Sequence, residues 1–143
     1  MSVSADELTG VAETVVERLL QLEHDVTLHG VLAPDEQDGW AWASEAAARD
    51  VAEGRADQAV VCCWTGTGAA IAANKVPGVR AALCNDAETA RGARRWNDAN
   101  VLALSLRTTS EAVLDEVLEA WFTAEASVEH DDVANVRHID EIT

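Results

Sequence analysis

The sequence predicts an α/β fold: a single three-layer domain with a five-stranded parallel sheet and helices on both faces. Short apolar segments with strand character alternate about five times with segments of helical character. The chain has 143 residues, 48% of them apolar, which is enough for one core, and it has no repeat or internal linker. Strands that alternate with helices are typical of a parallel sheet with right-handed crossovers. We therefore expect one domain over residues 1–143, with a polar C-terminal tail over about 125–143.

The first part of the chain is expected to hold two short strands and two helices. The helix over 8–22 carries valines and leucines on one face, and the alanine-rich helix over 40–53 is followed by Gly54, which favours a helix end. His24 and His29 flank the second strand and are expected to be solvated or packing residues. In order, we expect a strand over 2–5, a helix over 8–22, a strand over 25–29, a polar loop over 33–39 and a helix over 40–53.

The centre of the chain combines a buried strand, a glycine-containing loop and a helix. Residues 59–63 are small or β-branched, residues 65–68 read Thr-Gly-Thr-Gly, and residues 69–73 favour a helix. The first amides of a helix lack partners and the helix dipole is positive there, so this loop can bind an anion. It lacks the Gly-Lys-Ser/Thr ending of a phosphate-binding Walker loop and the third glycine of the dinucleotide fingerprint. From spacing alone, a tight turn beside a buried cysteine, Cys63, is an equal alternative.

The second part of the chain continues the alternation. We expect a strand over 79–84, a helix over 86–96, a strand over 99–106 and a last amphipathic helix that reaches Phe122. The sequence from Thr108 to Glu111 matches a capping box that would open this helix. Ligands of such folds bind beyond the carboxyl ends of the strands. The loops of interest therefore follow Ala5, Gly30, Cys63, Cys84 and Leu106.

The composition restricts the partners and the compartment. The net charge is −16 and Lys75 is the single lysine, so nucleic acids and anionic membranes are poor partners. We interpret the acidity as halophilic, an adaptation to a high-salt cytoplasm that screens self-repulsion. The three cysteines, two of them adjacent, suit neither a disulfide framework nor a zinc site, and no grouping has metal-ligand spacing. The sequence does not open with a charged-then-apolar leader pattern and has no apolar run of membrane length, so we expect a cytoplasmic protein. From the missing ligand spacing we also expect no metal.

A longer motif resembles a known family. Residues 63–75 end in Ile-Ala-Ala-Asn-Lys, and Val-Pro-Gly-Val-Arg-Ala-Ala-Leu-Cys follows at 76–84. Together with Trp-Asn-Asp-Ala-Asn-Val-Leu-Ala-Leu at 96–104, this resembles the type B ribose-5-phosphate isomerases and the subunits of galactose-6-phosphate isomerase. The resemblance implies a Rossmann-like sheet, a homodimer or homotetramer with sites at the subunit interface, and aldose–ketose isomerisation of sugar phosphates without metal or cofactor. It also implies an enediolate mechanism, in which a base moves a proton between neighbouring carbons.

The resemblance assigns roles to individual residues. By its place in the motif, Cys63 matches the catalytic cysteine of the family, and Thr65 matches a threonine that assists ring opening and proton transfer. A helix N-terminus stabilises a thiolate, which can act as base. Cys62 should point to the opposite face of the sheet. The remaining matches are backbone amides that would stabilise the enediolate, substrate contacts and phosphate-binding arginines. These are Gly66, Thr67, Gly68 and Ala69 for the amides, Asn97 and Asp6 for the substrate, and Arg107 and Arg137 for the phosphate.

The chain also departs from the family pattern. Trp96 stands where the family has a ring-opening histidine, and Glu7 stands where it has another histidine after the first strand. Trp64 replaces a glycine of the loop, and the usual Asp-Tyr-Pro reads Asp-Gly-Trp at 38–40. We expect Trp40, Trp42, Trp64 and Trp96 to lie near the mouth of the site, where aromatic rings can stack on a sugar.

These departures leave two functions open. The first is a sugar-phosphate isomerase with Cys63 as base, acting on a substrate other than ribose 5-phosphate. A tetrose phosphate is already open-chain and would not need the missing histidine. The alternative is a non-catalytic sugar-phosphate-binding or regulatory subunit on the same fold. A redox role for Cys62 and Cys63 is disfavoured, because adjacent cysteines form strained bridges.

Overall fold

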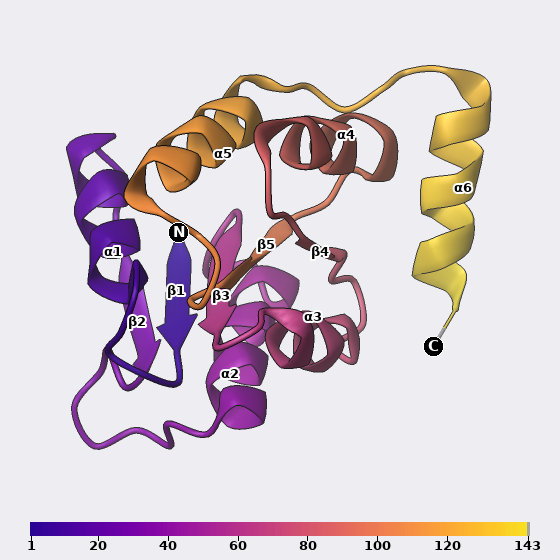
Figure 1. The fold of residues 1–143 in the computed structure, drawn as a ribbon. Coiled ribbons are helices and arrows are strands. Elements are labelled where there is room, and N and C mark those ends of the chain that lie inside the picture. The colour runs from indigo at the N-terminus through magenta and orange to yellow at the C-terminus, as the bar shows by residue number, and fades with distance from the viewer. Residues whose placement is uncertain (143) are drawn as a thin grey trace.

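The computed structural model describes residues 1–142 and contains one five-stranded, all-parallel sheet (Figure 1). The strands lie in the order β2-β1-β3-β5-β4, so β2 and β4 form the edges. Their bounds are Ser2–Ala5 for β1, Thr27–Gly30 for β2, Ala59–Cys63 for β3, Ala81–Leu83 for β4 and Val101–Ser105 for β5. The predicted fold class and the predicted bounds of the first and third strands are confirmed.

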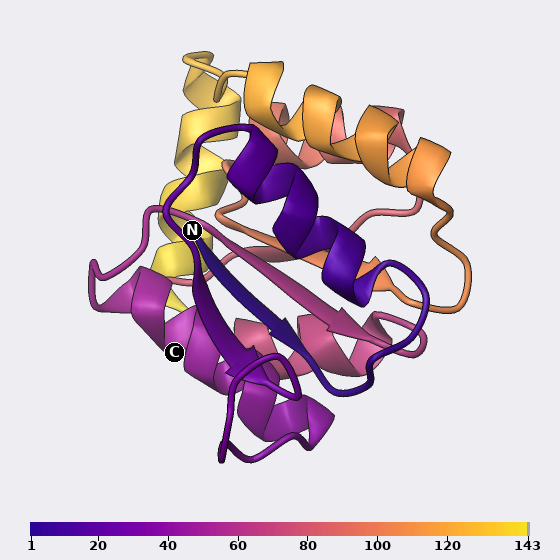
Figure 2. The same cartoon turned by 90° about the vertical axis from the view of Figure 1, so that its left-hand side faces the viewer.

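Helices cover both faces of this sheet (Figure 2). Helices α1, α4 and α5 cover one face, and α2 and α3 cover the other. Helix α6 stands beside the β4 edge instead (Figure 1). The bounds are Ala12–Gln21 for α1, Trp40–Ala52 for α2, Thr67–Asn74 for α3, Ala87–Asn97 for α4, Glu111–Thr123 for α5 and His130–Glu141 for α6.

Each face of the sheet has its own apolar cluster. Along β3, Val60 and Cys62 face the α1/α4/α5 layer, while Val61 and Cys63 face the α2/α3 layer. This alternation is the period of two of a strand, and it confirms that the adjacent cysteines point to opposite faces. The first layer is the bulkier one and contains Trp121, which is fully buried and donates its indole N–H to Gln58 Oε1 at 2.9 Å. The second is built mainly of alanines, which lets α2 and α3 approach the sheet closely.

Two helix starts differ from the prediction for local reasons. Helix α1 begins at Ala12 rather than at residue 8, because Gly10 has φ +54° and packs so closely that an added Cβ would lie 2.4 Å from the Leu106 carbonyl oxygen. The prediction of a capping box at Thr108 is wrong, since the Thr108 amide donates to Ser105 Oγ at 3.2 Å and Thr108 lies in a turn before the helix. The true N-cap of α5 is Ser110, whose hydroxyl accepts the Val113 amide at 3.2 Å.

The segment expected to be a polar tail contains a helix, α6. None of its residues is buried, and Arg80 holds it through an ion pair from Nη1 to Asp140 Oδ1 at 2.8 Å. Its apolar residues Val133 and Ile139 are exposed. The helix therefore gains little burial from the rest of this chain. Thr143, the last residue of the predicted tail, lies outside the described residues.

Candidate active site

The carboxyl ends of β1, β3 and β5 meet at one edge of the sheet. The register pairs Ala5 with Cys62 and Cys63 with Ser105, so the residues that follow these strands are neighbours. Of the predicted site residues, this edge holds Asp6, Cys63, Thr65, Gly66, Thr67, Gly68, Ala69 and Arg107. The predicted clustering of the loops after the first, third and fifth strands is thus what the structure shows.

The loop between β3 and α3 makes a tight turn at Gly66. This residue is the N-cap of α3, with φ +76°, and its amide donates to the Cys63 carbonyl at 3.2 Å. A Cβ on Gly66 would lie 2.9 Å from both Leu104 C and Ser105 N of β5. Only glycine fits this left-handed backbone against a neighbouring strand. The turn points the first amides of α3 toward the end of β3, as an anion site requires.

Cys63 lies at the centre of this turn. Its thiol is buried, and the Ala69 amide in the first turn of α3 donates to Sγ at 3.4 Å. The sulfur thus faces a backbone N–H at the positive end of a helix. For Cys62, burial, with smaller effects of Cys63 and Asp6, raises the pKa of the thiol to about 12. Burial likewise raises the pKa of Cys84 to about 12. Cys63 is therefore the cysteine with a surrounding suited to chemistry.

Thr65 and Thr67 present their hydroxyls at the surface of the loop. Their Oγ1 atoms are 2.8 Å apart, so one hydroxyl donates to the other, and both residues are exposed. A hydroxyl pair of this kind can pass a proton to or from a bound sugar hydroxyl.

Asp6 directly follows Ala5, which is paired with Cys62, so the ends of β1 and β3 bring Asp6 near Cys63. Burial raises the pKa of its carboxyl, and the nearby charges of Glu7 and Asp38 act in the same direction, against backbone hydrogen bonds that lower it. Its Oδ1 atom is buried and has no hydrogen-bond partner among residues 1–142. A buried, unpartnered carboxylate oxygen costs free energy unless a ligand bonds to it. Asp6 Oδ1 can therefore accept a hydrogen bond from a hydroxyl group of a ligand.

Arg107 reaches the same edge from the end of β5. Its amide donates to the Trp64 carbonyl at 2.9 Å, which ties the two loops together. In this acidic chain most guanidinium groups are neutralised by carboxylates: those of Arg18, Arg49, Arg55, Arg80, Arg91 and Arg94. Within the described part of the chain, Arg95, Arg107 and Arg137 have no such partner. Both residues predicted to bind phosphate are thus available to an outside anion.

Two of the four tryptophans expected at the mouth lie there. Trp64 follows Cys63 directly, and the Trp40 ring lies against Gly68 in the first turn of α3, where a Cβ would be 2.9 Å from Trp40 Cε3. Both rings are about half exposed. Trp42 instead packs against Gly39, and Trp96 packs back onto Gly92 of its own helix. For Trp96 the prediction is wrong within one chain.

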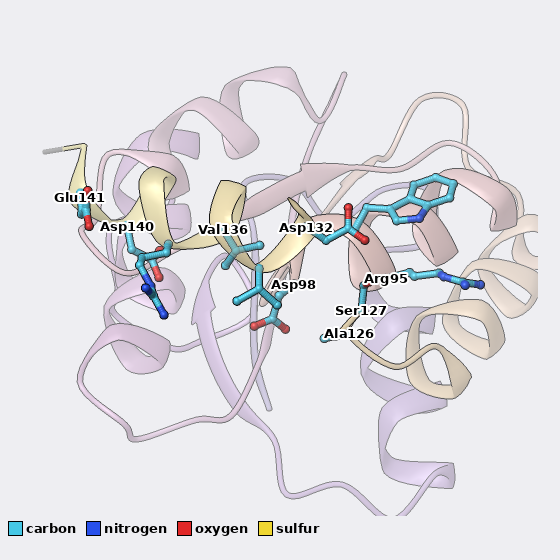
Figure 3. A pocket seen from close by; sticks show the side chains of 11 residues that line it. Arg95, Asp98, Ala126, Ser127, Asp132, Val136, Asp140 and Glu141 are labelled. Atoms are coloured by element: carbon cyan, nitrogen blue, oxygen red, sulfur yellow. The ribbon is translucent and has the colours of Figure 1, made fainter. Parts of the chain in front are cut away.

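Asn97 and Arg137 do not lie at this edge. Asn97 ends α4 just before β5 begins, so it lies at the amino edge, on the order of 15 Å from Cys63, the length of a five-residue strand. Arg137 is on α6 and lines a cavity of about 430 Å³ between α4 and α6, together with Arg95 and Trp96. Asp98, Asp132, Asp140 and Glu141 line the same cavity (Figure 3), so carboxylates outnumber the two arginines. Within one chain this cavity does not suit a phosphate.

The sequence did hold a signal for this separation. A residue that ends a helix just before a parallel strand must lie at the amino edge of the sheet, opposite the carboxyl edge where ligands bind. Of the two roles expected for His29, solvation is wrong: its ring is mostly buried and lies between the carboxylates of Glu36 and Asp50, two contacts that the sequence did not predict. His24 is a packing residue, as expected, and stacks on Phe122 with ring centroids 4.7 Å apart.

The described residues contain neither a metal-binding group nor a membrane-spanning helix. Over residues 1–142, no three His, Cys, Asp or Glu side chains are grouped closely enough to hold a metal ion. In the same range, no helix has the length and apolar character needed to cross a membrane.

Comparison with known proteins shows the relationship of the chain. Residues 2–142 match the family described as Ribose/Galactose Isomerase. The chain is similar to galactose-6-phosphate isomerase subunit LacB of Clostridium acetobutylicum, with 38% identity over 68% of this chain and 57% of that protein. It is also similar to D-erythrulose-4-phosphate isomerase of Pectobacterium atrosepticum, with 40% identity over 54% of this chain and 51% of that protein. The chain thus spans about half the length of these curated relatives.

A solved structure agrees over nearly the whole length. Ribose-5-phosphate isomerase B of Clostridium thermocellum superposes with a TM-score of 0.86 at 30% identity and covers 99% of this chain and 97% of that one. The all-parallel sheet and the helices on both its faces therefore have the arrangement of that protein. From the family match over residues 2–142 and this likeness, the chain belongs to the ribose/galactose isomerase family.

Proposed function

We propose that the protein is an aldose–ketose isomerase of sugar phosphates that works through an enediolate. The observation that carries this proposal is the position of Cys63, whose Sγ accepts the Ala69 amide at the N-terminus of α3 while Asp6 lies beside it. Aldose–ketose isomerisation needs a base next to the carbon that loses a proton, and a positive surrounding for the oxygen that becomes negative. In this proposal the base is Cys63 at the end of β3, and the positive surrounding is the N-terminus of α3 that follows it.

Cys63 is the base in this proposal. Its thiolate takes the proton from the carbon beside the carbonyl and returns it to the neighbouring carbon, so no atom is gained or lost overall. Of the four amides predicted to stabilise the enediolate, that of Gly66 donates to the Cys63 carbonyl and that of Ala69 to Cys63 Sγ. The amides of Thr67 and Gly68 therefore face the developing negative oxygen, and the Thr65–Thr67 hydroxyl pair exchanges protons with the sugar hydroxyls. Asp6 orients the substrate through its unpartnered Oδ1. Arg107 binds the phosphate, and this is consistent with its freedom from carboxylate partners in the described chain.

A homodimer completes the site. Asn97 and Arg137 lie at the far edge of their own chain, and both belong to the predicted substrate contacts. A second copy related by a two-fold axis can bring its α4 end and α6 to the carboxyl edge of the first, twice per dimer. Two features support this arrangement: α6 has no buried residue, and the large apolar residues near it are exposed. These are Trp96, Val133, Ile139 and Ile142.

The preferred substrate in this proposal has four carbons. A tetrose 4-phosphate cannot close a furanose ring, because its 4-oxygen carries the phosphate, so it needs no ring-opening histidine at the position of Trp96. The Trp40 ring lies against Gly68 and Trp64 directly follows Cys63, so two bulky residues stand beside the loop, which disfavours a longer sugar. One relative is named a D-erythrulose-4-phosphate isomerase, which supports this size class.

Subunit complementation tests the catalytic and the dimeric parts together. Cys63→Ala and Arg137→Ala should each abolish isomerisation of D-erythrulose 4-phosphate, while Cys62→Ala, on the opposite face of β3, should keep it. When the two inactive variants are unfolded, mixed and refolded, half of the dimers carry one site with both native residues. Activity should then return to about a quarter of the wild-type value per chain. An inactive mixture that still forms dimers would show that the site is not shared.

A further inference from the structure

His29 lies between two carboxylates on different elements. Its Nε2 atom is 2.7 Å from Asp50 Oδ2 of α2, and its Nδ1 atom is 3.0 Å from Glu36 Oε2 in the loop over 31–39. The ring is mostly buried, with 14% of the side chain exposed. Carboxylate oxygens accept hydrogen bonds and donate none. A neutral imidazole has one N–H and can satisfy only one of these partners, whereas an imidazolium satisfies both.

The other groups around the ring hold this arrangement in place. Asp50 also accepts Arg55 Nε at 2.8 Å and the Ser2 hydroxyl at 2.9 Å, so it is fixed independently of the loop. Arg55 itself pairs with Glu53. Glu36 additionally accepts the Gly30 amide at 3.1 Å, directly after His29 in β2. The charged groups facing this network are therefore Glu36, Asp50 and Arg55, and a cationic ring between the two carboxylates balances them.

The loop fixed by this contact leads to the mouth of the proposed site. Glu36 lies four residues before Trp40, whose ring covers Gly68 at the N-terminus of α3. Asp38 lies close enough to Asp6 for its charge to raise the pKa of that carboxyl. The loop amide of Val31 also donates to the Ala5 carbonyl at 2.9 Å, beside Asp6. A displacement of the loop would therefore move Trp40 and Asp38 relative to the substrate.

We infer that His29 is held as an imidazolium between Glu36 and Asp50, and that this doubly bonded ring clamps the loop over 31–39 so that Trp40 covers the mouth of the site. His29 and Glu36 are positioning residues, since neither touches the reacting atoms. The consequence for catalysis rests on the proposed function, but the clamp itself does not.

The first test observes the ring directly. Nitrogen-15 NMR of the full chain at neutral pH should show both ring nitrogens of His29 protonated, with the signal assigned by its loss in His29→Gln. His24, in the same chain, provides an internal reference that faces Phe122 rather than two carboxylates. A His29 ring with one unprotonated nitrogen at neutral pH would overturn the inference.

The second test observes the loop. Glu36→Gln removes the charge and weakens the contact, whereas Asp35→Asn removes a charge from the same loop at a residue with φ +61°, a conformation that asparagine tolerates. Hydrogen exchange of the Gly30 amide should be about tenfold faster in Glu36→Gln, because charge-assisted hydrogen bonds are the stronger ones, and unchanged in Asp35→Asn. Equal exchange in the two variants would overturn the clamp.

Kinetics connect the clamp to the site. Glu36→Gln should raise KM for D-erythrulose 4-phosphate with little change in kcat, since Trp40 contributes to binding rather than to proton transfer. An unchanged KM alongside faster exchange would refute the link between the loop and the mouth. A protonated ring and a protected Gly30 amide in a protein that isomerises no sugar would instead refute the proposed function and leave the clamp intact.

Discussion

Gly66 should be the least replaceable residue of the β3–α3 loop. Its φ of +76° costs alanine roughly 1–2 kcal/mol, because a Cβ in the left-handed region meets its own carbonyl. The Cβ would also lie 2.5 Å from Leu83 Cδ1 and 2.9 Å from two backbone atoms of β5. The leucine methyl can move, but the strand cannot, which adds roughly 1–3 kcal/mol. Gly66→Ala should therefore destabilise the protein by about 3 kcal/mol.

Gly78 provides the matched control. Its φ is +82°, nearly that of Gly66, but a Cβ there would meet no atom within 4 Å. Gly78→Ala should thus cost only the conformational part, about 1 kcal/mol. In thermal unfolding at one fixed salt and protein concentration, these values correspond to a fall in Tm of about 12 °C for Gly66→Ala and about 4 °C for Gly78→Ala. Equal falls would refute the claim that β5 closes the space around Gly66, and with it the described position of the loop amides.

Three further variants or titrations test separate parts of the structure. Asp6→Asn should abolish activity yet stabilise the fold. The pKa of Asp6 is raised above 3.8 in the folded state, so the wild-type protein loses stability as the pH rises from about 3.8 through the folded-state pKa. In urea unfolding, the variant should be more stable than wild type above this pH window and no more stable than wild type at low pH. For Asp50, burial opposes ionisation, but hydrogen bonds from His29, Arg55 and Ser2 outweigh it and hold the pKa below 3.8. The stabilising contribution of Asp50 is complete above pH 3.8 and is lost as the pH falls through its folded-state pKa. Asp50→Asn should therefore make the free energy of unfolding depend less on pH below 3.8 in an acid titration. Leu104→Ala, at a fully buried position of β5, should cost about 3 kcal/mol in chemical denaturation without changing the m-value, and a loss below 1 kcal/mol would contradict the close packing of the α1/α4/α5 layer.

The elements around the central loop could be predicted because their signals are local. The apolar run from Ala59 to Cys63, the two loop glycines and the following alanines each favour the conformation that they adopt. The start of α1 could not be predicted from helical periodicity, because it depends on Gly10 meeting the Leu106 carbonyl, a contact between distant residues. The start of α5 depends in the same way on the hydroxyl of Ser105, which holds Thr108 outside the helix.

The remaining differences have a different cause. Helix α6 has no buried face, so hydrophobic periodicity gave no reason to expect it. Asn97 and Arg137 were predicted to act with Cys63 from a motif, and a motif does not encode how far apart its residues lie within one chain. His29 was missed because its partners, Glu36 and Asp50, are brought to it by a loop and a helix rather than by neighbouring sequence.

The central claim is that Cys63 moves a proton on the carbon skeleton of a sugar phosphate. Proton NMR in D₂O at high salt, with four-, five- and six-carbon aldose phosphates, tests it most directly. We predict that wild-type protein introduces deuterium beside the carbonyl and forms the ketose, most rapidly with the four-carbon substrate, and that folded Cys63→Ala does neither. Exchange by Cys63→Ala at the wild-type rate would contradict the assigned base. A wild-type dimer that binds one of these sugars without any exchange would instead indicate a non-catalytic binding protein.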